Sequence, residues 1–182
     1  TFLDTHNDSN TVSYETPRFA GFKFGASWTP EPDADNSNQV FGPADVNNGL
    51  HDAFSFASNF TRTFQDVTVN AAGGINVAPN EDGDDIKQYT GGLNIAFGGF
   101  NVGGNVGIQD SDGANDGTNG GSNFATTDGE AYSAGIGYTT GPWSFAGEWM
   151  QTEVEGRVTG AGSNGEDELQ VFKGAVEYAL GP

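Results

Sequence analysis

The sequence predicts an all-β fold, specifically a transmembrane antiparallel up-and-down β-barrel. Three observations lead to this prediction. Long stretches of the chain alternate strictly between an apolar residue and a small or polar one, which is the pattern of a strand with one face toward lipid and the other toward water. Aromatic residues stand near the ends of these stretches, and the connections between them are alternately short and long. Soluble sheets also alternate, so the alternation alone does not establish a membrane protein.

Composition excludes several other classes of protein. The chain has 182 residues, of which 29 are glycine and only 35% are hydrophobic, too few for an ordinary two-layer core. The mean hydropathy is -0.47 and no apolar run approaches the ~20 residues of a transmembrane helix, whereas a barrel strand averages out to polar. Cysteine is absent, so the sequence offers neither a disulfide framework nor a thiolate metal site.

Charge narrows the classes further. The 25 acidic and 6 basic residues give a net charge of -19, which excludes a nucleic-acid-binding protein on electrostatic grounds. Most acids fall between the alternating stretches, and hardly any occupy a lipid-facing parity inside them. This distribution fits strands that cross a membrane, because a charge at mid-bilayer is costly.

The alternation predicts nine strands, and each is assigned by the parity of its apolar residues. The first two surround a Pro-containing turn, and Trp28 lies on the apolar parity of the second. Phe54 and Phe60 share the apolar parity of the third. The clearest pair places Leu93 on one face and Asn94 on the other, and it turns at Gly98-Gly99, which can supply the positive φ angles of a two-residue hairpin. The predicted strands cover residues 11–15, 21–29, 53–60, 67–77, 88–97, 100–109, 131–138, 143–151 and 170–180.

The connections sort into two kinds. Four are tight, namely residues 16–19, 61–66, 98–99 and 139–142. The other four are long, acidic and rich in Gly, Asn and Asp, namely residues 30–52, 78–87, 110–130 and 152–169. Short turns at one end and long polar loops at the other are typical of an outer-membrane barrel, whose turns face the periplasm.

Aromatic residues form two bands on the apolar parity. The band beside the short turns comprises Phe19, Phe60, Phe64, Phe97, Phe100, Tyr138, Trp143 and Tyr178. The band toward the long loops comprises Trp28, Phe54, Tyr89, Tyr132 and Trp149. Two bands separated by smaller apolar residues match the aromatic girdles at the two interfaces of a membrane barrel.

A resemblance to a known family rests on residues 10–30, which contain a strand, a Pro17-Arg18-Phe19 turn and a second strand. This stretch resembles the region that follows the constriction loop in general porins of alphaproteobacteria, and the later hairpins at residues 132–149 and 171–180 are similar to the same family. The resemblance implies a barrel of about sixteen strands, usually a homotrimer, that passes small hydrophilic solutes passively across the outer membrane.

The same resemblance implies that the chain is an internal segment of a longer porin. Nine strands is an odd number, whereas single-chain bacterial barrels have even numbers, and the sequence shows neither a signal peptide nor a terminal aromatic strand. We therefore expect residues 1–182 to form one partial porin β-barrel domain, with no second domain, in which residues 1–10 are the trailing end of the constriction loop.

Charged residues on the polar parity of the strands, together with two acids before the first strand, are the pore-lining candidates. Charges of both signs on a small, polar wall set a transverse field and bias ion selection. Ordinary salt bridges of a barrel wall are the alternative interpretation for any one of them. The candidates are Asp4, Asp8, Glu15, Lys23, Glu148, Lys173 and Glu177.

Other site signals are weaker. Asp110, Asp112 and Asp116 have the oxygen density of a calcium site, and residues 80–85 are similar, but neither segment has the spacing of an EF-hand, so a solvated acidic loop is the alternative. Divalent cations bridging such loops to lipopolysaccharide phosphates are a further hypothesis. His6 and His51 stand alone and carry no metal prediction. No catalytic motif is present, so we expect neither an enzyme nor a required cofactor.

Three functions remain open on the sequence. The first is a trimeric, water-filled porin for ions and small hydrophilic solutes, weakly cation-selective because of its acidic loops. The second is a small closed outer-membrane barrel with an adhesion or anchoring role, since the chain length by itself suits eight strands. The third is a secreted, calcium-loaded acidic β-protein, which would have to bury both aromatic bands.

Overall fold

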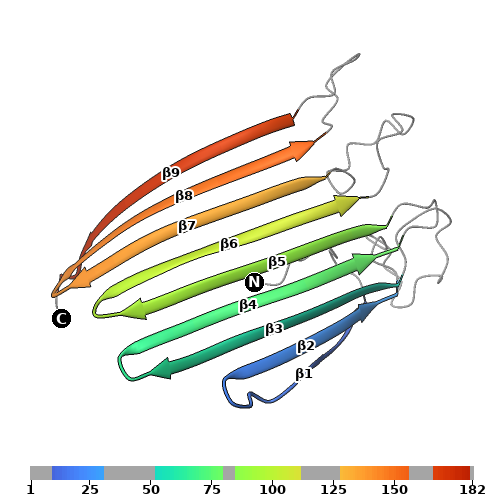
Figure 1. Cartoon of the computed structure of the whole chain (residues 1–182), viewed down its shortest axis with the longest axis horizontal. Coiled ribbons are helices and arrows are strands. Elements are labelled where there is room, and N and C mark those ends of the chain that lie inside the picture. The colour runs from blue at the N-terminus through green and yellow to red at the C-terminus, as the bar shows by residue number, and fades with distance from the viewer. Residues whose placement is uncertain (1–9, 31–51, 80–84, 112–127, 156–165, 181–182) are drawn as a thin grey trace.

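The computed structural model describes residues 10–30, 52–79, 85–111, 128–155 and 166–180. They form one nine-stranded antiparallel sheet in which each strand pairs only with its neighbours in the sequence, as Figure 1 shows. The strands are β1 (Val12–Glu15), β2 (Phe22–Thr29), β3 (Ala53–Phe64), β4 (Val67–Ala78), β5 (Ile86–Phe97), β6 (Phe100–Ser111), β7 (Gly129–Thr140), β8 (Trp143–Glu155) and β9 (Glu166–Tyr178). The predicted all-β, up-and-down arrangement is confirmed.

Several strands are longer than predicted, and β3 shows why. The sequence places a turn at residues 61–66, but β3 continues to Phe64, so the turn is reduced to Gln65 and Asp66. Thr63 and Thr68 face each other across it and share a hydrogen bond of 2.9 Å. Gln65 adopts a φ of 54° without being glycine, and this positive φ permits a two-residue turn that residue type did not reveal.

The prediction for the last strand is also wrong at both ends. The strand was expected at residues 170–180, whereas β9 begins at Glu166 and ends at Tyr178. Its first four residues belong to the long, acidic connection that the sequence predicts at residues 152–169. In the structure they continue the ladder with β8, since a hydrogen-bonded strand extends beyond its apolar segment wherever the partner strand extends too.

The turn between β5 and β6 has the predicted geometry. Gly98 and Gly99 have φ angles of 52° and 85°, so both adopt the positive φ that favours the hairpin turns of twisted strands. At Gly99 glycine is required for a second reason. A Cβ atom there would lie 2.6 Å from the carbonyl oxygen of Thr139, which belongs to the neighbouring strand β7.

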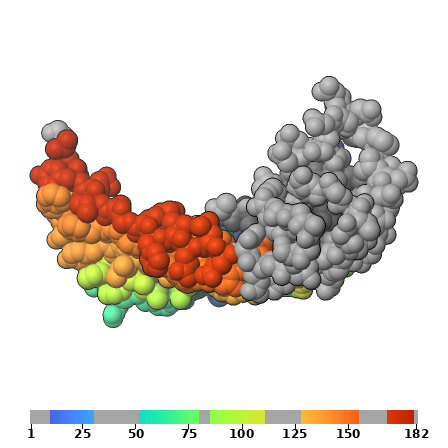
Figure 2. All heavy atoms as spheres, turned by 90° about the horizontal axis from the view of Figure 1, so that it is seen from above, coloured from blue at the N-terminus to red at the C-terminus, as the bar shows by residue number. Residues whose placement is uncertain are grey.

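The register sorts side chains onto two faces. Asn94 of β5 stands opposite Asn70 of β4 and Gly103 of β6, whereas Leu93 stands opposite Ala71 and Gly104. We call the side that carries Asn94 the polar face and the side that carries Leu93 the apolar face. Figure 2 shows that the sheet is bowed rather than flat.

The apolar face is not covered by any other described part of the chain. Phe56 is 51% exposed, Leu93 49% and Phe172 75%, and the buried apolar side chains are limited to Ala53, Ala78 and Ile86 among the described residues. An exposed apolar surface of this extent marks contact with lipid or another protein. None of the described residues belongs to a helix long and apolar enough to cross a membrane.

Aromatic rings run along the turn end of the apolar face, where the sequence predicts one of its two bands. The ring centroids of Phe97 and Phe100 lie 5.7 Å apart, and those of Phe100 and Tyr138 lie 4.4 Å apart. Trp143 and Tyr178 meet edge to face at 4.7 Å. Each such pair contributes about 0.5–1.5 kcal/mol beyond simple burial, so the band holds neighbouring strands together where the sheet has no core.

Candidate pore-lining face

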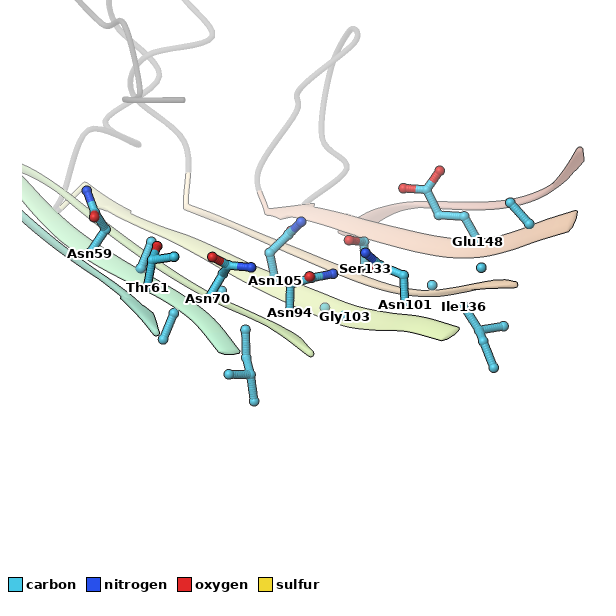
Figure 3. A pocket seen from close by; sticks show the side chains of 18 of the residues that line it. Asn59, Thr61, Asn70, Asn94, Asn101, Gly103, Asn105, Ser133, Ile136 and Glu148 are labelled. Carbon is cyan, nitrogen blue, oxygen red and sulfur yellow. Dashed lines mark hydrogen bonds between the residues drawn. The ribbon is translucent and has the colours of Figure 1, made fainter. Parts of the chain in front are cut away.

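A hollow of about 610 Å³ lies against the middle of the polar face. Small and uncharged polar side chains from β3 to β7 surround it, and Glu148 of β8 stands at its border. Figure 3 shows the polar side chains on one side of the sheet and Ile136 on the other. The labelled polar residues are Asn59, Thr61, Asn70, Asn94, Asn101, Asn105, Ser133 and Glu148.

Glycines make the floor of the hollow. Gly92, Gly103 and Gly135 lie among the amide-bearing residues and leave the backbone bare. A Cβ atom at Gly103 would lie 2.8 Å from the side-chain nitrogen of Asn94 and 2.9 Å from the carbonyl oxygen of Leu93, so any larger residue would displace Asn94. The high glycine content of the strands therefore keeps space open above the sheet.

Toward the loop end, the polar face carries a chain of side-chain hydrogen bonds that we call the amide ladder. Ser55 donates to Asn76 at 2.9 Å, Asn76 donates to Gln88 at 3.2 Å, and Gln88 donates to Gln109 at 2.8 Å. These four residues come from four consecutive strands and stand opposite one another in the register. Asn76 and Gln88 are buried, so the ladder satisfies amides that would otherwise be costly.

The five predicted wall charges that the structure describes all lie on the polar face, and four of them form pairs. Lys23 and Glu15 are 2.5 Å apart, and Lys173 and Glu148 are 3.7 Å apart. Both pairs are partly solvent-exposed, so each contributes at most about 1 kcal/mol. Glu177 stands opposite Ser144 and has no ion-pair partner among the described residues. Ordinary wall salt bridges, the alternative interpretation, describe the two pairs well.

The remaining predicted site residues fall largely outside the described chain. This applies to Asp4, Asp8, Asp112 and Asp116. Asp110 is the penultimate residue of β6 and stands opposite Lys87 on the apolar face, at its loop end. Within the described ranges no three His, Asp or Glu residues are grouped to hold a metal ion. Calcium binding at Asp110, Asp112 and Asp116 stays a prediction.

Arg18 is a residue of this face that the sequence analysis missed. Its guanidinium donates to the carbonyl oxygen of Gly21 and to the side-chain oxygen of Asn59, both at 2.6 Å. Asn59 lines the hollow, so a positive charge lies beside the polar face at the turn end. The sequence identified Arg18 only as part of a turn, because nothing in the alternation places a turn residue on either face.

The loop ends of β7 to β9 depart from the predicted charge distribution. Charges were expected to be rare on the apolar parity, yet Glu130, Glu153 and Glu168 occupy it. A hydrogen-bonded set accompanies them: Gln170 donates to Glu168 at 3.0 Å and to Gln151 at 3.1 Å. These residues lie beyond the loop-side aromatic band, so the strands continue past the apolar segment into polar surroundings.

Comparisons with known proteins agree with this geometry. The profile of the Gram-negative porin family matches residues 1–182. A porin whose structure was refined at 1.8 Å resolution is similar, with a TM-score of 0.59 and 17% identity, over 96% of this chain and 52% of that one. An anion-selective porin from Comamonas acidovorans gives a TM-score of 0.43 and 15% identity, over 94% of this chain and 59% of that one.

At these levels of identity, the similarity to the first structure concerns the fold alone. The chain spans about half the length of the solved porins it matches. No curated protein matches the sequence.

Proposed function

Because the chain belongs to the Gram-negative porin family, we propose that it forms part of the wall of a water-filled channel, through which ions and small hydrophilic solutes diffuse passively across the outer membrane. The outer membrane is the location that family membership gives. The proposed transport is passive and includes no catalysed step or required cofactor.

The observation that carries the proposal is the separation of the two faces of the sheet. One face is lined by small polar side chains around a hollow of about 610 Å³, and the other exposes Phe56, Leu93 and Phe172. In a soluble protein the apolar face would require a covering layer. In a membrane barrel lipid covers it, and the polar face meets water in the lumen.

The nine strands account for a little over half of a barrel of about sixteen strands, which we propose for the whole protein. β1 and β9 are the edge strands of the sheet that the described residues form, and in a membrane we expect further strands to pair with their outer backbone groups. The Pro17-Arg18-Phe19 turn supports assignment to the alphaproteobacterial type. A homotrimer is proposed on the same resemblance, with residues 1–10 as the end of a constriction loop.

Weak cation preference is the second part of the proposal. On the described wall Glu15, Glu148 and Glu177 are balanced by Lys23, Lys173 and Arg18, so the wall gives little bias. The net charge of -19 therefore resides mostly elsewhere, and we assign the preference to the acidic loops. A preference of this origin weakens with salt, because the screening length falls from about 10 Å at 0.1 M to about 3 Å at 1 M.

The acidic loops also suggest partners at the membrane surface. We propose that divalent cations, including calcium at Asp110, Asp112 and Asp116, bridge them to lipopolysaccharide phosphates. Removal of divalent cations with a chelator from outer-membrane vesicles should then lower the thermal stability of the protein, and addition of calcium should restore it. Unchanged stability would exclude this part of the proposal.

The decisive test is single-channel recording of the intact protein in a planar bilayer under a salt gradient. We expect ohmic conductance steps in groups of three and a reversal potential that indicates cation preference at low salt and declines at high salt. A protein that inserts but never conducts would favour the closed anchoring barrel. Conductance in single steps would contradict the trimer alone.

A further inference from the structure

A row of uncharged polar side chains crosses the middle of the polar face. Asn70 and Asn94 stand opposite each other on β4 and β5, and Asn105 stands opposite Ser133 on β6 and β7. Asn101 completes the row and accepts a hydrogen bond from Asn94. Directly opposed residues of neighbouring strands have Cβ atoms about 5 Å apart, so each of these two opposed pairs places two polar side chains close together at the hollow.

These groups are available to a solute. Among the described residues the side chains of Asn70, Asn105 and Ser133 make no hydrogen bond to other protein groups, although all three line the hollow. The amide ladder of Ser55, Asn76, Gln88 and Gln109 is different, because every member bonds to a neighbour, whereas in the row only Asn94 and Asn101 do so. Both sets lie on the polar face. The amide ladder is structural, whereas the row has side chains that can bind a solute.

The chemistry of the row selects for neutral solutes that carry hydroxyl groups. Each amide offers two donors and an acceptor, and each hydroxyl offers one donor and two lone pairs, so a polyhydroxylated molecule can replace bound water group for group. The row itself contains no charged side chain, and Glu148 at the border of the hollow is paired with Lys173. An ion gains little there, because amides repay its hydration only in part.

The glycines beneath the row allow a solute to come close to the backbone. Gly92, Gly103 and Gly135 present bare backbone between the amides, and a Cβ atom at Gly92 would only reach ordinary contact, 3.5 Å from the Cβ of Asn105. The glycine floor and the open amides therefore form a shallow trough, wide enough within its 610 Å³ for a short oligosaccharide segment.

We propose that this row is a low-affinity binding site for neutral polyhydroxylated solutes, meaning sugars and sugar alcohols, on their way through the channel. The proposal rests on the proposed function, since the row must face a water-filled lumen. It goes beyond passive diffusion by size, because it predicts that hydrogen-bonding capacity, and not size alone, decides how long a neutral solute stays in the pore.

The test compares two neutral probes of equal hydrodynamic size on the intact protein in a planar bilayer. Maltotriose carries many hydroxyl groups, whereas polyethylene glycol offers ether acceptors and almost no donors. We expect maltotriose to produce current noise that saturates with concentration and polyethylene glycol to lower conductance without saturation. Replacing Asn70, Asn94 and Asn105 by Ala should weaken maltotriose binding by about tenfold or more, because two or three hydrogen bonds are lost.

Thr68→Val is the matched control, since Thr68 lies on the polar face but outside the lining of the hollow. It should leave maltotriose binding unchanged. Equal, non-saturating effects of the two probes on the wild-type protein would overturn the binding site while the channel remains established. Absence of any ion conductance would overturn the proposed function and this inference together. Both outcomes are read on the wild-type protein, so they do not depend on whether the triple variant assembles.

Discussion

Replacing two adjacent residues of β5 by arginine tests the assignment of the two faces. Leu93 and Asn94 are neighbours in sequence, but Leu93 lies on the apolar face and is 49% exposed, whereas Asn94 lies on the polar face. If the apolar face meets lipid, Leu93→Arg places a charge in hydrocarbon. Asn94→Arg places the same charge in water.

The position of Leu93 sets the size of the effect. It lies midway between Tyr89 and Phe97, which are on the same face, in the loop-side and turn-side aromatic bands. The eight residue-to-residue steps from Tyr89 to Phe97 span about 26 Å of strand, close to the ~25 Å height of the apolar band of a membrane barrel. Leu93 is therefore near the midplane, where arginine costs about 2–4 kcal/mol.

Asn94→Arg should cost much less. It removes the hydrogen bond to Asn101, a loss of about 1 kcal/mol, and otherwise exchanges one hydrated side chain for another. The added positive charge in the wall should lower the cation preference of the channel. Leu93→Ala serves as the control for lost side-chain volume, so that the excess cost of Leu93→Arg reports the charge.

The assay is urea unfolding of the intact protein in lipid vesicles, followed by tryptophan fluorescence. We expect the free energy of unfolding to fall in the order wild type, Asn94→Arg, Leu93→Arg, with the last two separated by at least about 1 kcal/mol. An equal or larger loss for Asn94→Arg would refute the assignment of the two faces, and with it the placement of the lumen.

Three further sets of substitutions test other parts of the structure. Gly99→Ala should lower the free energy of unfolding by about 2–4 kcal/mol, because the new side chain combines a positive φ with a backbone clash. Gly98→Ala should cost about 1 kcal/mol, because there is open space around its Cβ. Equal costs for the two variants would contradict the turn geometry. Lys173→Gln should shift the reversal potential toward stronger cation preference, and Glu148→Gln should shift it toward weaker cation preference. If neither variant changes the reversal potential, the pair lies outside the ion path. Gln88→Leu should cost about 1–3 kcal/mol, because it removes the hydrogen bonds that Gln88 makes with Asn76 and with Gln109, and wild-type stability in urea would show that other groups replace these two bonds.

Much of this fold could be predicted from the sequence, because the position of a residue along a strand determines the face on which its side chain lies. Once Leu93 and Asn94 are assigned to opposite faces, every other residue of the hairpin follows, and the two glycines fix its turn. Strand ends could not be predicted in the same way. Beyond the apolar segment the backbone ladder continues with polar side chains, as at Glu153 and Glu168, and no alternation marks where it stops.

Some candidate site residues could be predicted from the sequence, and others could not. Glu15 and Lys23 could be placed on one face from parity alone, and their proximity follows from the register of β1 and β2. The role of Arg18 could not be predicted, because its contact with Asn59 depends on the path of a turn. The distinction between bonded amides, such as Gln88, and open ones, such as Asn105, depends on side-chain conformations that residue types do not encode.

The consecutive order of the strands affects how such a sheet assembles and where its sequence can vary. Every ladder in the sheet joins strands that are adjacent in the chain, so each new strand can dock onto the edge left by the previous one without waiting for a distant segment. The tight turns set the register within their hairpins, and the long connections need only reach from one strand to the next. Residues can therefore be inserted or lost in the long connections while the strands keep their register, so these connections can vary in length and sequence without loss of the sheet.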